Sequence, residues 1–248
     1  PHLMEFAMTL RFTTLALCCT AALAACSPQP AASDNHAASA VAAAASEAGS
    51  VTIDTARGEA TVPANPERIA VYDWGMLDTL GKLGVDVGAT TTNIRLGYLQ
   101  DAARNMQPVG TLFEPDYEAL HAFAPQLIIT GSRTAPAFEQ LSKLAPTIEM
   151  TADTTKMRES TEARIDAFAK IFHKEAEAQA LKKEIDESFA AAKAAAQGKG
   201  SGLVILVNGG KMSAFGPDSR FGWIHRDVGV PTVDAEIKEG SHGQPISF

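Results

Sequence analysis

Hydrophobic and polar positions alternate between strand-like and helix-like patterns from residue 51 onward. Residues 51–54 and 59–62 alternate on either side of Arg57-Gly58, which predicts a small hairpin. Short apolar runs predict four buried strands, at residues 68–72, 86–89, 126–130 and 147–150. Helical spacing predicts helices at residues 98–105, 115–123 and 135–144, and one with an apolar face of Met76, Leu77, Leu80 and Leu83 capped by Gly84. Such alternation favours a parallel sheet covered by helices.

The chain after residue 150 predicts two long helices and then a new strand-and-helix region. The helices cover residues 157–172 and 175–197, and the second has a stripe that we expect to be buried, made of Ala180, Leu181, Ile185, Ser188 and Phe189. At ~1.5 Å per residue this second helix is ~35 Å long, which is enough to brace two lobes. Beyond Gly202 the pattern predicts strands at 203–207, 212–215 and 231–233, a turn at Gly209-Gly210 and a helix at 221–228.

The predicted fold class is therefore α/β, with two α/β lobes joined by one long backbone helix. We expect the first lobe at residues 51–150, a helical segment with the inter-lobe helix at 151–199, and a partial second lobe at 200–248. Only about one and a half strand-helix units of the second lobe precede Phe248, whereas a stable doubly wound sheet usually has more. We therefore expect the second lobe to be truncated.

The N-terminal region has the pattern of an export signal. Arg11 precedes an apolar run at residues 12–23 that is too short to span a bilayer, and small Ala24 and Ala25 precede Cys26. This segment, residues 8–25, resembles a bacterial lipoprotein signal peptide, in which the thiol of Cys26 receives a lipid. Residues 26–50 are rich in Ala, Ser and Pro, with almost no large apolar side chains, and we expect them to form a disordered tether.

Composition narrows the classes of partner. The formal net charge of -8 argues against nucleic acid, because a phosphate backbone needs clustered Lys and Arg. All three cysteines lie in the leader, so the mature body has no disulfide to stabilise it. No later apolar run approaches the ~20 residues of a transmembrane helix, so we expect membrane attachment only through lipid at Cys26.

Five segments in order resemble one family. They are GEATVPANPERIAVYDWG at 58–75, VGTLFEPDYEAL at 109–120, PQLIITG at 125–131, FGPDSRFG at 215–222 and GSHG at 240–243. Together they resemble the periplasmic siderophore-binding lipoproteins that serve ATP-driven importers of ferric catecholates, and within that family the branch that handles ferric enterobactin. The resemblance implies a lipid-anchored periplasmic monomer with no intrinsic cofactor. Its ligand would be a ferric siderophore held between the lobes, and its partner an inner-membrane ABC permease.

Two arginines are candidate ligand-binding residues. Ferric catecholates carry net negative charge, and the planar guanidinium suits paired oxygens. Arg133 follows the strand that ends at Thr130, and Arg220 lies in the tight Pro217–Gly222 turn, so both sit where open α/β sheets place ligands. A loop arginine is more commonly a solvated charge. The resemblance favours Arg220 over Arg133, because family members often have the arginine directly after the glycine that matches Gly131, whereas Ser132 stands there in this chain.

Two further residues acquire roles through the resemblance. His242 lies between the glycines of Gly240-Ser-His-Gly243, which let the backbone approach a ligand closely. The resemblance implies that His242 binds the ferric iron of a tetradentate siderophore, together with a tyrosine later in the chain. Glu118 alone would be an ordinary solvated helix carboxylate, but it matches the position at which the family docks on its permease. The remaining histidines suit surface or capping roles.

Two alternative functions remain open. A lipoprotein of the same fold could bind a divalent metal or another small ligand, but a metal site needs three or four converging ligands and only His242 is well placed. An enzyme is the other alternative. The sequence has no nucleophile elbow, no dinucleotide fingerprint and no phosphate loop, so we do not expect an enzyme.

Overall fold

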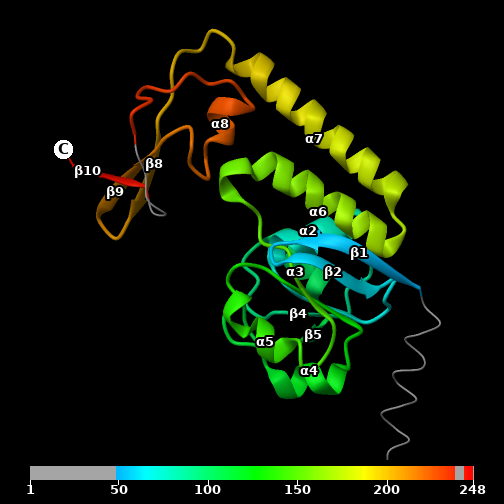
Figure 1. The fold of residues 1–248 in the computed structure, drawn as a ribbon. Coiled ribbons are helices and arrows are strands. Elements are labelled where there is room, and N and C mark those ends of the chain that lie inside the picture. Colours follow the sequence, from blue (N-terminus) through cyan, green and yellow to red (C-terminus); the bar gives the residue numbers. More distant parts are fainter. Residues whose placement is uncertain (1–48, 238–242, 248) are drawn as a thin grey trace, which may run out of the picture.

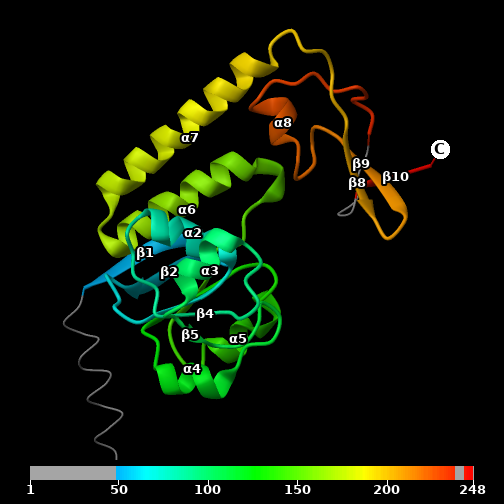
Figure 2. The ribbon, with the colours of Figure 1, turned by 180° about the vertical axis from the view of Figure 1, so that it is seen from behind.

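The computed structural model describes residues 49–237 and 243–247, and Figures 1 and 2 show its two opposite faces. The described part begins with the predicted hairpin. Strand β1 (Ser50–Thr55) pairs antiparallel with β2 (Gly58–Pro63), and Gly58 at the turn has φ +97°, a left-handed conformation that favours glycine. One face of the hairpin packs on the core through Ile53 and Val62, which are buried.

A five-stranded parallel sheet forms the centre of the first lobe. Its strand order is β5-β4-β3-β6-β7, and the central strands β3 (Ile69–Tyr72) and β6 (Leu127–Thr130) are buried at every position. The flanking strands are β4 (Ala89–Thr90), β5 (Gln107–Pro108) and β7 (Thr147–Glu149). Three of the four predicted strands are confirmed, and the one expected at residues 86–89 is instead the two-residue strand β4, which shares only Ala89 with it. The pattern missed β5 because two residues, one of them proline, form no apolar run.

Helices cover the sheet, as the alternation predicted. They are α2 (Trp74–Lys82), α3 (Gly97–Ala103), α4 (Tyr117–Phe123), the 3₁₀ turn η1 (Ala135–Ala137) and α5 (Phe138–Leu141). The four positions expected to form the apolar face of α2 are all buried, and Gly84 follows the helix with φ +69°. The single helix expected at residues 135–144 is instead a 3₁₀ turn and one α-helical turn. Pro136, in the 3₁₀ turn, lacks a backbone donor.

Two helices follow the first lobe, separated by His173 in a left-handed conformation. The 3₁₀ turn η2 (Thr154–Lys156) leads into α6 (Met157–Phe172), and α7 (Glu175–Ala196) packs beside α6 in both views. The buried stripe of α7 differs from the expected one, because Ala178 is buried while Ala180 and Ser188 are exposed. Ala178, Leu181 and Ile185 share a face at helical spacing, and the last two are half-buried.

The last part of the chain forms a small antiparallel sheet with order β10-β9-β8. Strands β8 (Val204–Asn208) and β9 (Lys211–Phe215) form a hairpin around Gly209 and Gly210, both with positive φ, and β10 (Gln244–Ile246) pairs with β9. The helix expected at 221–228 is one turn, α8 (Trp223–Arg226). The strand expected at 231–233 contributes one isolated bridge, between Gly202 and Thr232.

Aromatic and cationic contacts connect this part to the helices. Phe189 of α7 meets Trp223 of α8 edge to face, with ring centroids 5.9 Å apart, and the Arg158 guanidinium lies 4.9 Å from the Phe189 ring. Arg226 of α8 donates to the carbonyl oxygen of Thr155 in η2. Within the described ranges, no helix is both long and apolar enough to cross a membrane.

Candidate functional site

The turn after β6 carries Arg133 at the carboxyl edge of the parallel sheet. The Thr134 amide donates to the Gly131 carbonyl oxygen (3.1 Å), which closes the turn, and Thr134 is fully buried. Its hydroxyl lies 3.3 Å from the Tyr72 carbonyl at the end of β3 and 2.6 Å from the Leu112 carbonyl. Arg133 itself is exposed and has no hydrogen bond or ion pair among the described residues. The fold therefore holds the backbone of this turn and leaves the Arg133 guanidinium available.

Gly131 is required by the carboxylate next to it. A Cβ at Gly131 would lie 2.6 Å from Oδ2 of Asp73, the residue that follows β3. Asp73 also accepts a hydrogen bond from the Met76 amide (3.0 Å) as the N-cap of α2. A side chain at position 131 would displace the Asp73 carboxylate, which explains the glycine that opens the turn.

Arg164 of α6 is a further cation near this edge, and the sequence analysis did not identify it. Burial lowers the pKa of Arg164, and the negative charge of Asp73 opposes that shift. Its Nη2 is 3.4 Å from the Thr161 hydroxyl. Arg164 lines a cavity of about 620 Å³ between the β1–β2 hairpin, the segment after β7, and α6. No sequence signal marked Arg164, because its place depends on how α6 crosses the sheet.

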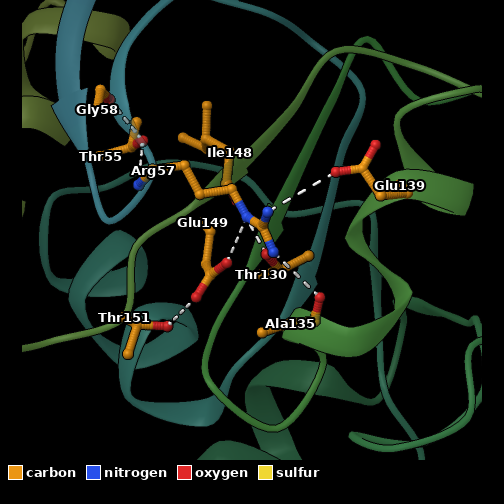
Figure 3. A network of polar contacts seen from close by, with 9 residues as sticks. All are labelled: Thr55, Arg57, Gly58, Thr130, Ala135, Glu139, Ile148, Glu149 and Thr151. Atoms are coloured by element: carbon orange, nitrogen blue, oxygen red, sulfur yellow. Dashed lines mark hydrogen bonds and ion pairs between the residues drawn. The ribbon is translucent and has the colours of Figure 1, made fainter.

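Arg57 in the hairpin turn joins three segments, as Figure 3 shows. Its Nε donates to Oε2 of Glu149 at 2.7 Å, and Nη2 lies 3.4 Å from the Ala135 carbonyl oxygen. Its guanidinium carbon lies 4.0 Å from the Phe138 ring centroid, and Glu139 is 3.7 Å from Nη1. Arg57 thus fastens the hairpin to β7 and to the segment that follows Arg133.

The turn that carries Arg220 follows β9 and is held by its own backbone. The Ser219 amide donates to the Gly216 carbonyl (3.2 Å), and the Gly222 amide donates to the Ser219 carbonyl (2.8 Å). A Cβ at Gly222 would lie 1.9 Å from the Pro217 carbonyl oxygen, so only glycine fits there. Arg226 donates to that same carbonyl as well as to Thr155, and thereby connects the turn to η2.

The guanidinium of Arg220 lies close to two aromatic rings. Its central carbon is 5.2 Å from the Phe215 centroid and 5.0 Å from the Phe221 centroid, and these rings meet edge to face at 4.9 Å. Nε of Arg220 is buried and has no hydrogen-bond partner among the described residues. An unpaired buried donor is costly, so an acceptor is expected at this position. Strand β9, which precedes this turn, belongs to an antiparallel sheet. The rule that ligands bind at the carboxyl edge of a parallel sheet therefore does not explain the position of Arg220.

The remaining sequence candidates are only partly described. Glu118 is exposed in the first turn of α4. Cys26 and His242 lie outside the described residues. Nδ1 of His225 is 2.8 Å from the Val230 carbonyl oxygen, which is a local structural contact. The described ranges contain no group of three or more His, Cys, Asp or Glu side chains that could hold a metal ion.

Comparisons with known proteins give a consistent picture. Residues 69–248 match a family model described as periplasmic binding protein. The chain is 40% identical over 191 residues to the petrobactin-binding protein YclQ of Bacillus subtilis, covering 75% of this chain and 60% of that relative. It is 29% identical over 207 residues to the ferric-anguibactin-binding protein FatB of Vibrio anguillarum, covering 79% and 63%. The chain thus spans about 60% of the length of these curated relatives.

Solved structures are similar over the same region. The crystal structure of YclQ from Bacillus subtilis superposes with a TM-score of 0.76 at 38% identity, over 80% of this chain and 72% of that one. The periplasmic catecholate-siderophore-binding protein VctP of Vibrio cholerae superposes with a TM-score of 0.73 at 30% identity, over 80% and 73%. The α/β fold class predicted from the sequence is confirmed by these matches.

Proposed function

This chain belongs to the periplasmic binding protein family, and we propose that it captures a ferric siderophore outside the cytoplasm and delivers it to an ABC importer. The names of the relatives support this proposal, since they describe proteins that bind petrobactin and ferric anguibactin. They describe binding proteins rather than enzymes, in agreement with the absence of catalytic motifs from the sequence. The ligand is the transported cargo, and no further cofactor is needed.

We further propose that the siderophore is a catecholate. The similarity to VctP supports this class, and so does the chemistry of the two cationic turns that carry Arg133 and Arg220. The observation that carries the proposal is Arg220, which lies beside the Phe215 and Phe221 rings and whose buried Nε has no partner among the residues that the structure describes. A guanidinium held in this way offers charge-assisted hydrogen bonds to paired anionic oxygens, and the adjacent rings shield those bonds from water.

The test is a fluorescence titration of the exported chain with a ferric catecholate, in which Trp74 and Trp223 report binding. We expect Arg220→Ala to weaken binding about ten- to a hundredfold, because a buried charge-assisted contact is worth roughly 1.5 to 3 kcal/mol. Arg133→Ala should cost less, because Arg133 is exposed and no ring holds it. Arg68→Ala is the matched control, since Arg68 lies at the opposite, amino edge of the sheet. Equal and small losses at Arg220 and Arg133 would contradict the assignment.

The finer expectations from the sequence form part of this proposal. The enterobactin branch supplies one candidate cargo, and His242 would fill open iron positions of a tetradentate complex. His242→Ala should therefore weaken a tetradentate ferric catecholate and leave a coordinatively saturated hexadentate one unchanged. Lipid attachment at Cys26 would hold the protein at the membrane, and exposed Glu118 would contact the permease. No observation in the structure favours the divalent-metal alternative over this proposal.

A further inference from the structure

We propose that Phe113 is a ligand-contacting residue that selects aromatic, catecholate-type siderophores, acting together with Arg133. Phe113 is 68% exposed, the highest exposed fraction among the large hydrophobic residues in the described ranges. A single exposed apolar side chain is ordinarily unremarkable on a protein surface. The inference comes from the loop that presents this ring and from the neighbour of that loop, and it rests on the proposed function.

Hydrogen bonds and close packing hold the loop at residues 110–116 in one conformation. The Thr111 hydroxyl accepts from the amides of Phe113 (3.2 Å) and Glu114 (3.0 Å), and the Thr111 amide donates to the Glu114 carbonyl (2.9 Å). Gly110, with φ +100°, has no space for a side chain, since a Cβ would lie 2.4 Å from the Glu114 oxygen. Leu112 is buried, so the residues before Phe113 are fixed while its own ring faces water. Little conformational freedom remains to be lost when a ligand covers the ring.

The Phe113 loop is joined directly to the turn that carries Arg133. The Thr134 hydroxyl donates to the Leu112 carbonyl at 2.6 Å, so Phe113 and Arg133 are the residues next to the two ends of one hydrogen bond. From backbone dimensions, their Cα atoms are no more than roughly 12 Å apart. Both residues follow parallel strands, β5 and β6, at the carboxyl edge of the sheet. That edge is where open parallel sheets place their ligands.

An aromatic ring and an unpaired guanidinium on two connected loops match one ligand chemistry. A catecholate is an aryl ring with two adjacent anionic oxygens. Phe113 can cover the ring in an offset or edge-to-face arrangement, and Arg133 can bind the oxygens through its planar fork. A hydroxamate or a carboxylate siderophore offers the oxygens without the ring. The pair would therefore favour catecholates, which no single cation on this edge can do.

The test is a titration of Phe113 variants with a ferric catecholate. The variants separate the contribution of the aromatic ring from that of apolar bulk, and a control variant replaces an exposed ring elsewhere on the surface. We expect Phe113→Leu to weaken binding about 2- to 12-fold, because leucine keeps apolar bulk and loses the ring, and Phe113→Ala to weaken it at least as much. Phe113→Tyr should stay within about threefold of the wild type. Tyr98→Leu is the control, since Tyr98 is also exposed (62%) but belongs to helix α3, where its hydroxyl is 3.3 Å from Asp78. The thermal midpoint of each variant checks folding, and we expect no change because Phe113 lies outside the core.

The outcomes separate this inference from the proposed function. If the wild type binds no ferric siderophore, the proposed function fails and the inference fails with it. If the wild type binds and Phe113→Ala or Phe113→Leu binds equally well, the proposed function stands and the role of Phe113 is refuted. Unchanged affinity combined with slower import by Phe113→Ala would also refute it, and would place the ring on the surface that faces the permease.

Discussion

Replacing Arg57 by alanine should destabilise the first lobe by removing the contact between its N-terminal hairpin and the carboxyl edge of the sheet. The ion pair between Arg57 and Glu149 joins residues that are 92 positions apart in the chain. The Glu149 side chain is only 11% exposed, whereas that of Arg57 is 42% exposed. Without the guanidinium, the Glu149 carboxylate would stay largely buried with only the Thr151 hydroxyl, 2.8 Å away, as its partner. The loss of a charged partner is therefore the main cost.

The magnitude follows from the separate contacts. A hydrogen bond to a charged group contributes roughly 1.5 to 3 kcal/mol when one partner is buried. The Phe138 ring adds about 0.5 to 1 kcal/mol, since the cation above it is partly exposed. The Glu139 pair adds little, because the Glu139 side chain is 79% exposed and the charges are 3.7 Å apart. We expect a total near 2 to 4 kcal/mol, or a fall in thermal midpoint of roughly 5 to 12 °C.

Chemical and thermal unfolding of the purified protein measure this loss. Arg104→Ala is the matched control, because the Arg104–Asp101 pair has both side chains at least 74% exposed. That substitution should change the free energy of unfolding by no more than about 0.5 kcal/mol. A double-mutant cycle with Arg57→Met and Glu149→Gln isolates the pair, and we expect a coupling energy of at least about 1 kcal/mol.

Two results would refute this reasoning. If Arg57→Ala is no more destabilising than Arg104→Ala, the Glu149 carboxylate is solvated well enough to stand alone. If the two substitutions in the cycle are additive, Arg57 and Glu149 do not stabilise one another, and the hairpin is held by the apolar contacts of its core face.

Two further predictions concern stability at high pH and association. Burial raises the pKa of the Tyr72 hydroxyl in the folded protein. As the pH rises through about 10, this hydroxyl therefore ionises in the unfolded chain first. The free energy of unfolding is intact below that pH and falls above it. Urea midpoints from pH 8 to 11 should fall less steeply for Tyr72→Phe than for the wild type, and equal slopes would contradict this. Val207 is 66% exposed on the outer strand β8, so Val207→Lys should reduce concentration-dependent association in sedimentation velocity, whereas Ala180→Lys on α7 should leave it unchanged.

The strand and helix pattern of the first lobe could be predicted because each of its elements has a local signature. Buried runs such as Ile69–Tyr72 and Leu127–Thr130 are apolar throughout, and helices such as α6 repeat their apolar positions every three or four residues. The candidate arginines, Arg133 and Arg220, could be named because each lies in a loop directly after a predicted strand.

Short-range patterns failed where an element is defined by its partner. Strand β5 has two residues and exists because Gln107 and Pro108 lie beside β4. Three of the five residues expected on the buried face of α7 are partly buried, whereas Ala180 and Ser188 are exposed. Alanine is neutral enough to lie on either side of a helix, and only the packing against α6 selects Ala178. The antiparallel pairing of β9 and β10 spans residues far apart in the chain, so no local signal could indicate it.

The amino-acid sequence by itself determined the family, the α/β class and the two cationic turns, because these depend on residue type and on spacing along the chain. Tertiary structure alone decided which groups meet: Arg57 with Glu149, Thr134 with Leu112, and Arg226 with the turn of Arg220. Hydrophobic periodicity sets which face of an element is buried, but it has no information about which distant polar group will lie within 3 Å. That pairing arises only when close packing brings buried donors and acceptors together and each must find a partner.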